Sequence, residues 1–240
     1  MNMIPATKLA YLDDTYLIED GAALVRIDAD ERGAFLVLDR TILYPQGGGQ
    51  PSDTGAIILG SDKLAINSVK KIDGEVRHYF NDHFYGAAES GANAMIKVDV
   101  EKRILHARYH TAGHLLSNIV ESLSEPGSLV AFKGFQYPEG AYVEFDNQSG
   151  IDVEIHIDSI NQKISLSIGD DLNILANYRS SERIEGHVNE ESSRLVQIGN
   201  YPPIPCGGTH VSKLSELKNV AVTKAKTKKN ITRISYALEL

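Results

Sequence analysis

The segment DVEKRILHARYHTAGHLLSNIVESL, residues 99–123, changes the hydrophobic period of the chain. Its apolar residues recur at steps of three and four, which is the pattern of an amphipathic α-helix. Asp99 is suited to cap the start of this helix, and Glu125-Pro126-Gly127 is suited to end it. The segment therefore predicts one long helix and a domain boundary near residue 95.

The residues before this helix predict a small β-barrel. Short apolar runs at 23–27 and 34–38 flank a polar turn with Gly33, and Asp73-Gly74 marks a second hairpin. Many short strands at close spacing are typical of a small barrel. The small residues of 85–94 suggest a loop beside it.

The residues after the helix mix strand and helix patterns. We expect a hairpin turning at Pro138-Glu139-Gly140, a strand end followed by an amphipathic helix within 152–172, and two closing strands within 219–238. The fold class is therefore α+β. We expect a barrel with a glycine-rich loop over residues 1–94 and an α+β domain over residues 95–240.

Composition limits the classes of protein that fit. The chain has 240 residues, a formal net charge of -8 and a single cysteine. One cysteine allows no internal disulfide, which fits a reducing cytoplasm. No apolar run is long enough to span a bilayer, and the N-terminal residues do not form a secretory signal. We therefore expect a cytoplasmic protein with no membrane partner.

His110 and His114 lie four residues apart within the predicted helix, so their side chains share one face. This spacing suits two ligands of one metal ion, although such a pair alone is weak evidence. His106 extends the row by one turn. Cys206 and His210 lie far along the chain, on either side of Gly207-Gly208-Thr209.

Together His110, His114, Cys206 and His210 make a set of three imidazoles and one thiolate, which suits zinc. The alternative for Cys206 is a buried, inert thiol beside a glycine turn. Four protein ligands normally indicate a closed structural site, whereas a catalytic zinc keeps one position open. With one position open, a zinc-bound water would supply hydroxide near neutral pH.

Two further segments have both a functional and a bland interpretation. YPQGGGQPSDTG, residues 44–55, combines glycines that allow close backbone approach with polar side chains, or it is a flexible barrel loop. It lacks the Gly-Lys-Ser/Thr of a nucleotide-binding loop. The acid-free stretch 218–233 either protects a strand edge with lysines or contacts phosphates.

Four motifs in this order resemble the editing domain of alanyl-tRNA synthetase and its free-standing relatives, the AlaX editing proteins. They are YPQGGGQPSDTG at 44–55, HTAGHLL at 110–116, GSLV at 127–130 and PCGGTHV at 205–211. KGFQYPEGAYVEF at 133–145 is similar to a hairpin of the free-standing members. The resemblance covers roughly Leu38 to Ile234. The chain departs from the synthetases at Gly113, where they often carry threonine, and at Pro202, where they tend to have an acid.

The resemblance implies a trans-acting editor of the longer AlaX type, a hydrolase that deacylates mischarged tRNA(Ala). Its substrates would be chiefly Ser-tRNA(Ala), with Gly-tRNA(Ala) in some members. It implies Zn2+ as cofactor, held by His110, His114, Cys206 and His210, with His106 outside the ligand set. The partner would be the acceptor end of a mischarged tRNA, with no nucleoside triphosphate. The oligomeric state stays open.

The expected roles of individual residues follow from this reaction, which is hydrolysis of an ester. The expected substrate-binding residues are Gln50, Asp53, Thr111, Gly207, Gly208 and Thr209. Backbone N–H groups near Gly207 and Gly208 would stabilise the oxyanion. The expected tRNA contacts are Lys224, Lys226, Lys228, Lys229 and Arg233. The alternatives are an editor of another mischarged tRNA, such as Ser-tRNA(Thr), and a non-catalytic RNA-binding module stabilised by zinc.

Overall fold

The computed structural model describes residues 7–81, 88–148, 150–178 and 194–239. The chain packs as two compact units, of which the first comprises Met1–Gly47 and Pro51–Ile104. The second comprises Gly48–Gln50 and Leu105–Leu240. Three residues of the glycine-rich loop therefore pack with the second unit. The expected division into a barrel domain at 1–94 and an α+β domain at 95–240 stays a prediction.

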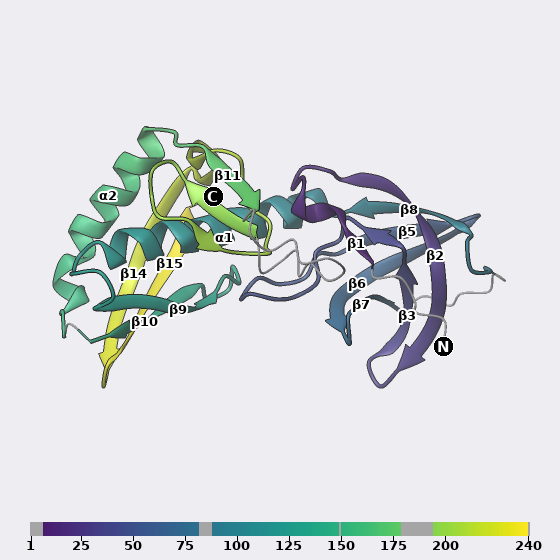
Figure 1. The fold of residues 1–240 in the computed structure, drawn as a ribbon, viewed down its shortest axis with the longest axis horizontal. Helices are drawn as coiled ribbons and strands as arrows, with labels where there is room; N and C mark the ends of the chain where they lie inside the picture. The colour runs from purple at the N-terminus through teal and green to yellow at the C-terminus, as the bar shows by residue number, and fades with distance from the viewer. Residues whose placement is uncertain (1–6, 82–87, 149, 179–193, 240) are drawn as a thin grey trace. The chain divides into compact units, whose positions relative to one another are not determined.

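The first unit contains a closed barrel of six strands (Figure 1). Around the barrel the strands run in the order β2 (Glu19–Asp30), β3 (Gly33–Leu38), β7 (Glu75–Phe80), β6 (Asp62–Ile72), β5 (Gly55–Leu59) and β8 (Asn93–Val98). Asp73 and Gly74 join β6 to β7 with φ values of 51° and 83°, which suits a tight hairpin turn. The predicted α+β class and barrel are confirmed.

Short elements complete this unit. β1 (Lys8–Leu9) pairs in parallel with β4 (Arg40–Thr41), and the 3-10 helix η1 (Ala10–Leu12) is buried. Alternate strand residues such as Leu36, Leu38 and Ile57 fill the barrel core. Of the loop expected at 85–94, residues 85–87 lie outside the described residues, 88–92 form no strand, and β8 begins at Asn93.

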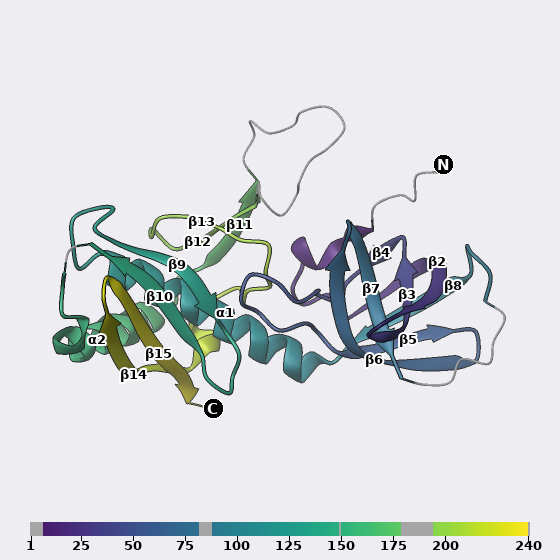
Figure 2. The same ribbon diagram turned by 90° about the horizontal axis from the view of Figure 1, so that it is seen from below.

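The second unit is built on the helix α1 (Val100–Glu121), whose first residues belong to the first unit. Asp99 caps α1, since its Oδ1 accepts a hydrogen bond from the Lys102 N–H at 3.3 Å. A four-stranded sheet follows the order β14 (Asn219–Lys228), β15 (Ile231–Glu239), β10 (Tyr142–Asn147) and β9 (Leu129–Phe135), and Figure 2 shows these strands side by side. Leu115, Leu116 and Ile119 of α1 share a core with Phe145 and Ile234 of this sheet.

The remaining elements differ in part from the prediction. The expected strand end before the amphipathic helix is a 3-10 turn, η2 (Val153–His156), because the Asp152 carboxylate accepts from the Glu154 N–H at 3.1 Å and starts a helical turn. The helix α2 (Ile157–Gly169) follows. A small sheet has the order β11 (Ile174–Tyr178), β12 (Arg194–Ile198) and β13 (Ile204–Pro205), and η3 (Leu214–Leu217) precedes β14. No helix in the described residues is long and apolar enough to cross a membrane.

Candidate metal centre

Four side chains of the second unit meet at one place: His110 and His114 on α1, and Cys206 and His210 on the loop after β13. One ligand atom from each residue lies within 4.8 Å of the others. Cys206 Sγ lies 3.4 Å from His110 Nε2 and 3.3 Å from His210 Nε2. Two segments far apart in the sequence therefore form one cluster.

This cluster fits the geometry of a bound metal ion. Tetrahedral zinc, with its usual bonds to nitrogen and sulfur, places neighbouring ligand atoms about 3.3–3.7 Å apart. Both measured sulfur–nitrogen distances agree with that spacing. His114 Nδ1 is also buried with no hydrogen-bond partner in the described part of the chain. The donor set of three imidazoles and one thiol could hold a metal ion.

Burial keeps the three histidines of the cluster in the neutral form that binds metal ions. It is the main cause that lowers the pKa of each histidine, to about 4 for His114 and well below the ordinary value for His110 and His210. The positive charge of Arg194 lowers these pKa values further. Each ring is therefore neutral at pH 7 and can offer a nitrogen lone pair.

The thiol behaves differently in the metal-free chain. Burial raises the pKa of Cys206 to about 11, and a hydrogen bond from Gly208 and the charge of Arg194 oppose that rise only in part. The free thiol is therefore protonated at neutral pH. A cation that binds the sulfur has to displace this proton.

Gln50 holds the cluster from the glycine-rich loop. Its Oε1 accepts hydrogen bonds from His110 Nδ1–H at 2.6 Å and from the Thr209 N–H at 3.1 Å, and its Nε2 donates to Thr209 Oγ1 at 2.8 Å. These bonds fix the His110 tautomer and leave Nε2 to face Cys206. Gln50 and Thr209 are both fully buried, and these bonds give them a positioning role at the cluster. Their expected substrate contacts stay predictions.

Thr111 has a similar role beside His210. Its hydroxyl donates to the Ala107 carbonyl at 2.9 Å and accepts from His210 Nδ1–H at 3.1 Å and from the Val211 N–H at 3.2 Å. The side chain is fully buried. These bonds orient the His210 ring. The expected substrate contact of Thr111 stays a prediction.

Arg194 holds the turn that carries Cys206. Its Nη1 donates to the carbonyls of Cys206 and Gly208, each at 2.9 Å, and its own carbonyl accepts from the Cys206 N–H at 3.0 Å. Sequence reasoning missed this residue. Its segment had no clear helix or strand pattern, and nothing in the sequence paired it with the distant cysteine.

Gly208 is required by close packing. Neither Gly207 nor Gly208 has a positive φ angle, so the backbone conformation does not itself require glycine at these positions. A Cβ on Gly208 would lie 2.2 Å from His110 Cε1 and 2.8 Å from Gln50 Oε1. Glycine therefore lets the backbone approach the His110 ring.

Asp53 lies outside this cluster, in the first unit. Its carboxylate is fully buried, and it accepts from Arg103 Nε at 2.9 and 3.0 Å and from the Tyr44 N–H at 2.6 Å. Asp53 thus forms a buried ion pair with Arg103 near the start of α1, and its expected substrate contact stays a prediction. No local pattern predicts this pairing of residues fifty positions apart.

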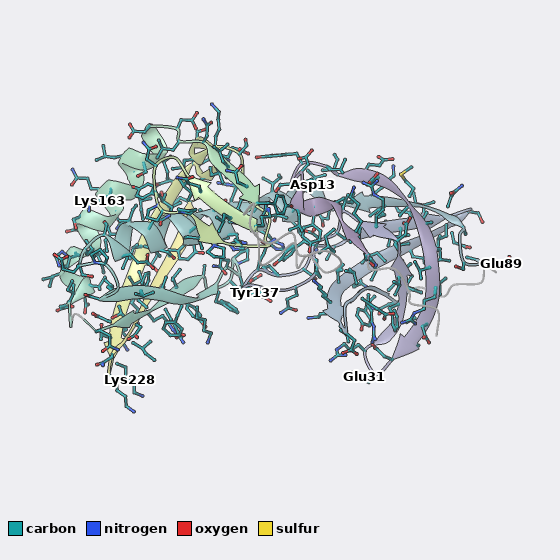
Figure 3. The ribbon with its side chains drawn as sticks, viewed as in Figure 1. Asp13, Glu31, Glu89, Tyr137, Lys163 and Lys228 are labelled. Atoms are coloured by element: carbon teal, nitrogen blue, oxygen red, sulfur yellow. The ribbon has the colours of Figure 1, made fainter. Side chains whose placement is uncertain are left out.

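The basic residues expected to contact tRNA are all exposed: Lys224, Lys226 and Lys228 on β14, Lys229 in the turn after it, and Arg233 on β15. Alternate residues of β14 and β15, such as Ala225 and Ile234, are buried in the core shared with α1. The cations therefore line the opposite face of the sheet. Figure 3 places Lys228 at the tip of the β14–β15 hairpin.

Aromatic rings lie on the same outer face. Phe135 stacks on Tyr137 with ring centroids 4.3 Å apart and on Tyr142 with centroids 5.2 Å apart. The Arg233 guanidinium lies 4.1 Å from the Tyr142 ring centroid and pairs with Glu144 at 2.6 Å. The outer face of the sheet thus combines stacked rings with positive charge, a combination that sequence reasoning did not foresee.

The comparisons with protein families first define the class. A family model described as "Threonyl and Alanyl tRNA synthetase second additional domain" matches residues 193–235, a range that includes Cys206 and His210. A model described as "tRNA synthetases class II (A)" matches residues 10–102, which include the barrel. Both matched families belong to the aminoacyl-tRNA synthetases.

Individual relatives then narrow the class. The chain is 29% identical to the alanyl-tRNA editing protein AlaX-M of Methanosarcina barkeri, over 96% of this chain and 98% of that protein. It is 29% identical to AlaX-L of Pyrococcus horikoshii, over 94% of this chain and 56% of that protein. It is 26% identical to the alanine–tRNA ligase of Methanobrevibacter smithii, over 97% of this chain and 27% of that protein. The chain is a relative of the AlaX editing proteins along nearly its whole length, and the resemblance inferred from its motifs is confirmed.

Proposed function

We propose that this chain is an aminoacyl-tRNA deacylase that acts in trans on mischarged tRNA(Ala). The observation that carries the proposal is the buried cluster of three histidines and Cys206, in a chain that is similar to AlaX-M along nearly its whole length. The reaction is hydrolysis of the ester between an amino acid and the terminal ribose. Its site of action is the cytoplasm, where charged tRNA is used.

We further propose that the cluster holds zinc. Two imidazoles fixed through their outer nitrogens, a third imidazole and a thiolate form a ligand set typical of zinc. Bound zinc polarises a carbonyl or lowers the pKa of a coordinated water, and either effect promotes ester hydrolysis. His110, His114, Cys206 and His210 would hold the ion, which would supply this chemistry or position the substrate.

The chain's own residues would position the reacting groups. Gln50 and Thr111 orient the His110 and His210 rings, and Arg194 fixes the turn around Cys206. The Gly208 N–H lies 3.3 Å from Cys206 Sγ, so it is engaged with the sulfur. Of the two expected oxyanion donors, the Gly207 N–H is therefore the one we retain.

The outer face of the four-stranded sheet supports an RNA partner. Lys224, Lys226 and Lys228 make no ion pair within the described residues, so their charges are available to phosphates. Stacked aromatic rings and a guanidinium beside them are typical of surfaces that bind single-stranded nucleic acid. The bland interpretation is protection of an edge strand, since β14 lies at the edge of its sheet.

Deacylation assays test the proposal directly. The purified chain is given Ser-, Gly- and Ala-tRNA(Ala) beside Ser-tRNA(Thr), and release of the amino acid is measured. We expect Ser-tRNA(Ala) to be hydrolysed fastest and Ala-tRNA(Ala) to be spared. Preference for Ser-tRNA(Thr) would assign the chain to another editing system, and no deacylation at all would favour an RNA-binding module.

The role of the metal is tested with variants of two cluster residues and one control histidine. We expect Cys206→Ala and His110→Gln to lose bound zinc, measured by elemental analysis, and to lower kcat/KM for Ser-tRNA(Ala) at least about 100-fold. His106→Gln is the matched control, because His106 lies one turn away and outside the cluster. If Cys206→Ala loses its zinc and still deacylates at the normal rate, the metal-dependent mechanism is wrong.

A further inference from the structure

A buried amide lies unpaired beside the metal centre. Gln136 follows β9, between Phe135 and Tyr137, and its backbone N–H donates to the Gly49 carbonyl at 2.9 Å. Its side chain is inside, and the residue is only 4% exposed. The Oε1 atom is buried and makes no hydrogen bond within the described residues. A buried oxygen without a hydrogen-bond partner from the protein costs free energy.

Three glycines from three separate segments make room for this amide. A Cβ on Gly49 of the loop would lie 2.4 Å from Gln136 Oε1, and one on Gly134 of β9 would lie 2.1 Å from Gln136 Nε2. A Cβ on Gly113 of α1 would lie 3.1 Å from the same nitrogen. Of the three, only Gly49 has a positive φ, so at Gly113 and Gly134 the backbone does not itself require glycine.

The amide borders the residues that build the cluster. Gly113 lies directly before His114 on α1 and three residues after His110, on the helix face that carries both. Gly49 lies directly before Gln50, whose Oε1 accepts from His110. A side chain needed only to fill this space would be apolar, since an apolar group avoids the unpaired oxygen.

We propose that the Gln136 amide recognises the hydroxyl of the seryl group on a mischarged tRNA, an inference that rests on the proposed function. Oε1 accepts the hydrogen bond that the serine hydroxyl donates. An alanyl group offers no donor and leaves the oxygen unpaired, so a correct Ala-tRNA(Ala) is held less well. A glycyl group also lacks the donor, so Gln136 contributes no hydrogen bond to the binding of Gly-tRNA(Ala).

The test compares two mischarged substrates on the same variant. Gln136→Met removes the amide and keeps a side chain of similar length. We expect kcat/KM for Ser-tRNA(Ala) to fall about 10- to 100-fold while that for Gly-tRNA(Ala) stays within about threefold. Gln148→Met is the matched control, because Gln148 directly follows β10 of the same hairpin and is exposed, with hydrogen bonds only to the exposed side chains of Asp146 and Asn230. The control should keep the wild-type ratio.

Two results would overturn the inference. Equal loss of both activities in Gln136→Met would show that the side chain supports the fold, and an unchanged seryl-to-glycyl ratio would show that it does not contact the hydroxyl. Gln136→Asn covers the case in which the methionine variant fails to fold, because it keeps the amide and withdraws it by one carbon. It should lower the seryl-to-glycyl ratio as well. A wild-type chain that deacylates nothing would instead refute the proposed function itself.

Discussion

Gln50 joins the glycine-rich loop to the cysteine turn and to the helix through three hydrogen bonds. Because its side chain is fully buried, removal of the amide leaves the buried groups of His110 and Thr209 without these hydrogen bonds. Histidine ligands depend on such outer partners for their tautomer and orientation. The metal affinity of the cluster should therefore depend on a residue that need not touch the metal.

We expect Gln50→Ala to weaken zinc binding about 10- to 100-fold, measured by competition with a chromophoric chelator. The free energy of unfolding should also fall by about 1–3 kcal/mol, because buried partners are left unpaired. Gln46→Ala is the control, since Gln46 belongs to the same loop and is exposed. Equal zinc affinity in the two variants would contradict the role of Gln50.

The four residues of the cluster could be predicted from the sequence, but the hydrogen bonds that orient their side chains could not. His110, His114, Cys206 and His210 stood out because ligand types recur at fixed spacing. Gln50 and Thr111 stood out as polar residues near motifs, but their partners depend on packing between distant segments. The departure at Gly113 now has a physical account, since a larger residue there would crowd Gln136 and the Tyr236 hydroxyl.

At the scale of the elements, the start of α1 is held by a buried ion pair. Arg103 Nε donates to both Asp53 oxygens, its Nη1 donates to the Thr15 carbonyl at 2.8 Å, and its Nη2 donates to Asp53 and to the Ile42 carbonyl. Both charged side chains are fully buried. Three segments of the first unit therefore converge on one guanidinium.

Arg103→Met should lower the free energy of unfolding by about 3–5 kcal/mol, because it leaves the Asp53 carboxylate buried and unpaired. Chemical denaturation followed by circular dichroism measures this change. Lys102→Met, next to it, removes an exposed pair with Asp99 at 3.6 Å and should cost under about 1 kcal/mol. Similar losses in both variants would mean that the buried pair has no special role.

The sequence predicted the elements better than their ends. The hairpin turns at Gly33, at Asp73-Gly74 and at 138–140 were found because glycine and proline mark turns directly. The helix α1 ends at Glu121, earlier than the Glu-Pro-Gly signal suggested, and the Glu121 carboxylate accepts from the Ala131 N–H at 2.8 Å. A contact of that kind depends on tertiary structure and leaves no local pattern.

At the scale of the whole molecule, charge is unevenly distributed. The chain has a formal net charge of -8, yet the outer face of the four-stranded sheet carries a column of lysines on β14. Lys226 lies opposite Arg233 in the register of β14 and β15. An acidic protein that binds RNA needs such a local concentration of cations, because like charges elsewhere repel the phosphates.

Lys226→Glu should raise KM for mischarged tRNA several-fold and reduce the slope of log KM against log salt by about 1 or more. Lys163→Glu on α2 is the matched control, with the same change of charge at another exposed position, and Figure 3 labels its site. If both variants raise KM equally, the effect reflects net charge alone. If neither does, the lysines of β14 serve only to protect the sheet edge.

The three residues Gly48–Gln50 also bear on how this protein can be dissected. They pack with the second unit although the residues on both sides of them belong to the first. A recombinant fragment cut from residue 95 onward would contain all four cluster residues and still lack the amide that orients His110. A minimal version of this unit would need that glutamine returned by a graft or a circular permutation, so the gene cannot be shortened at the barrel without redesign.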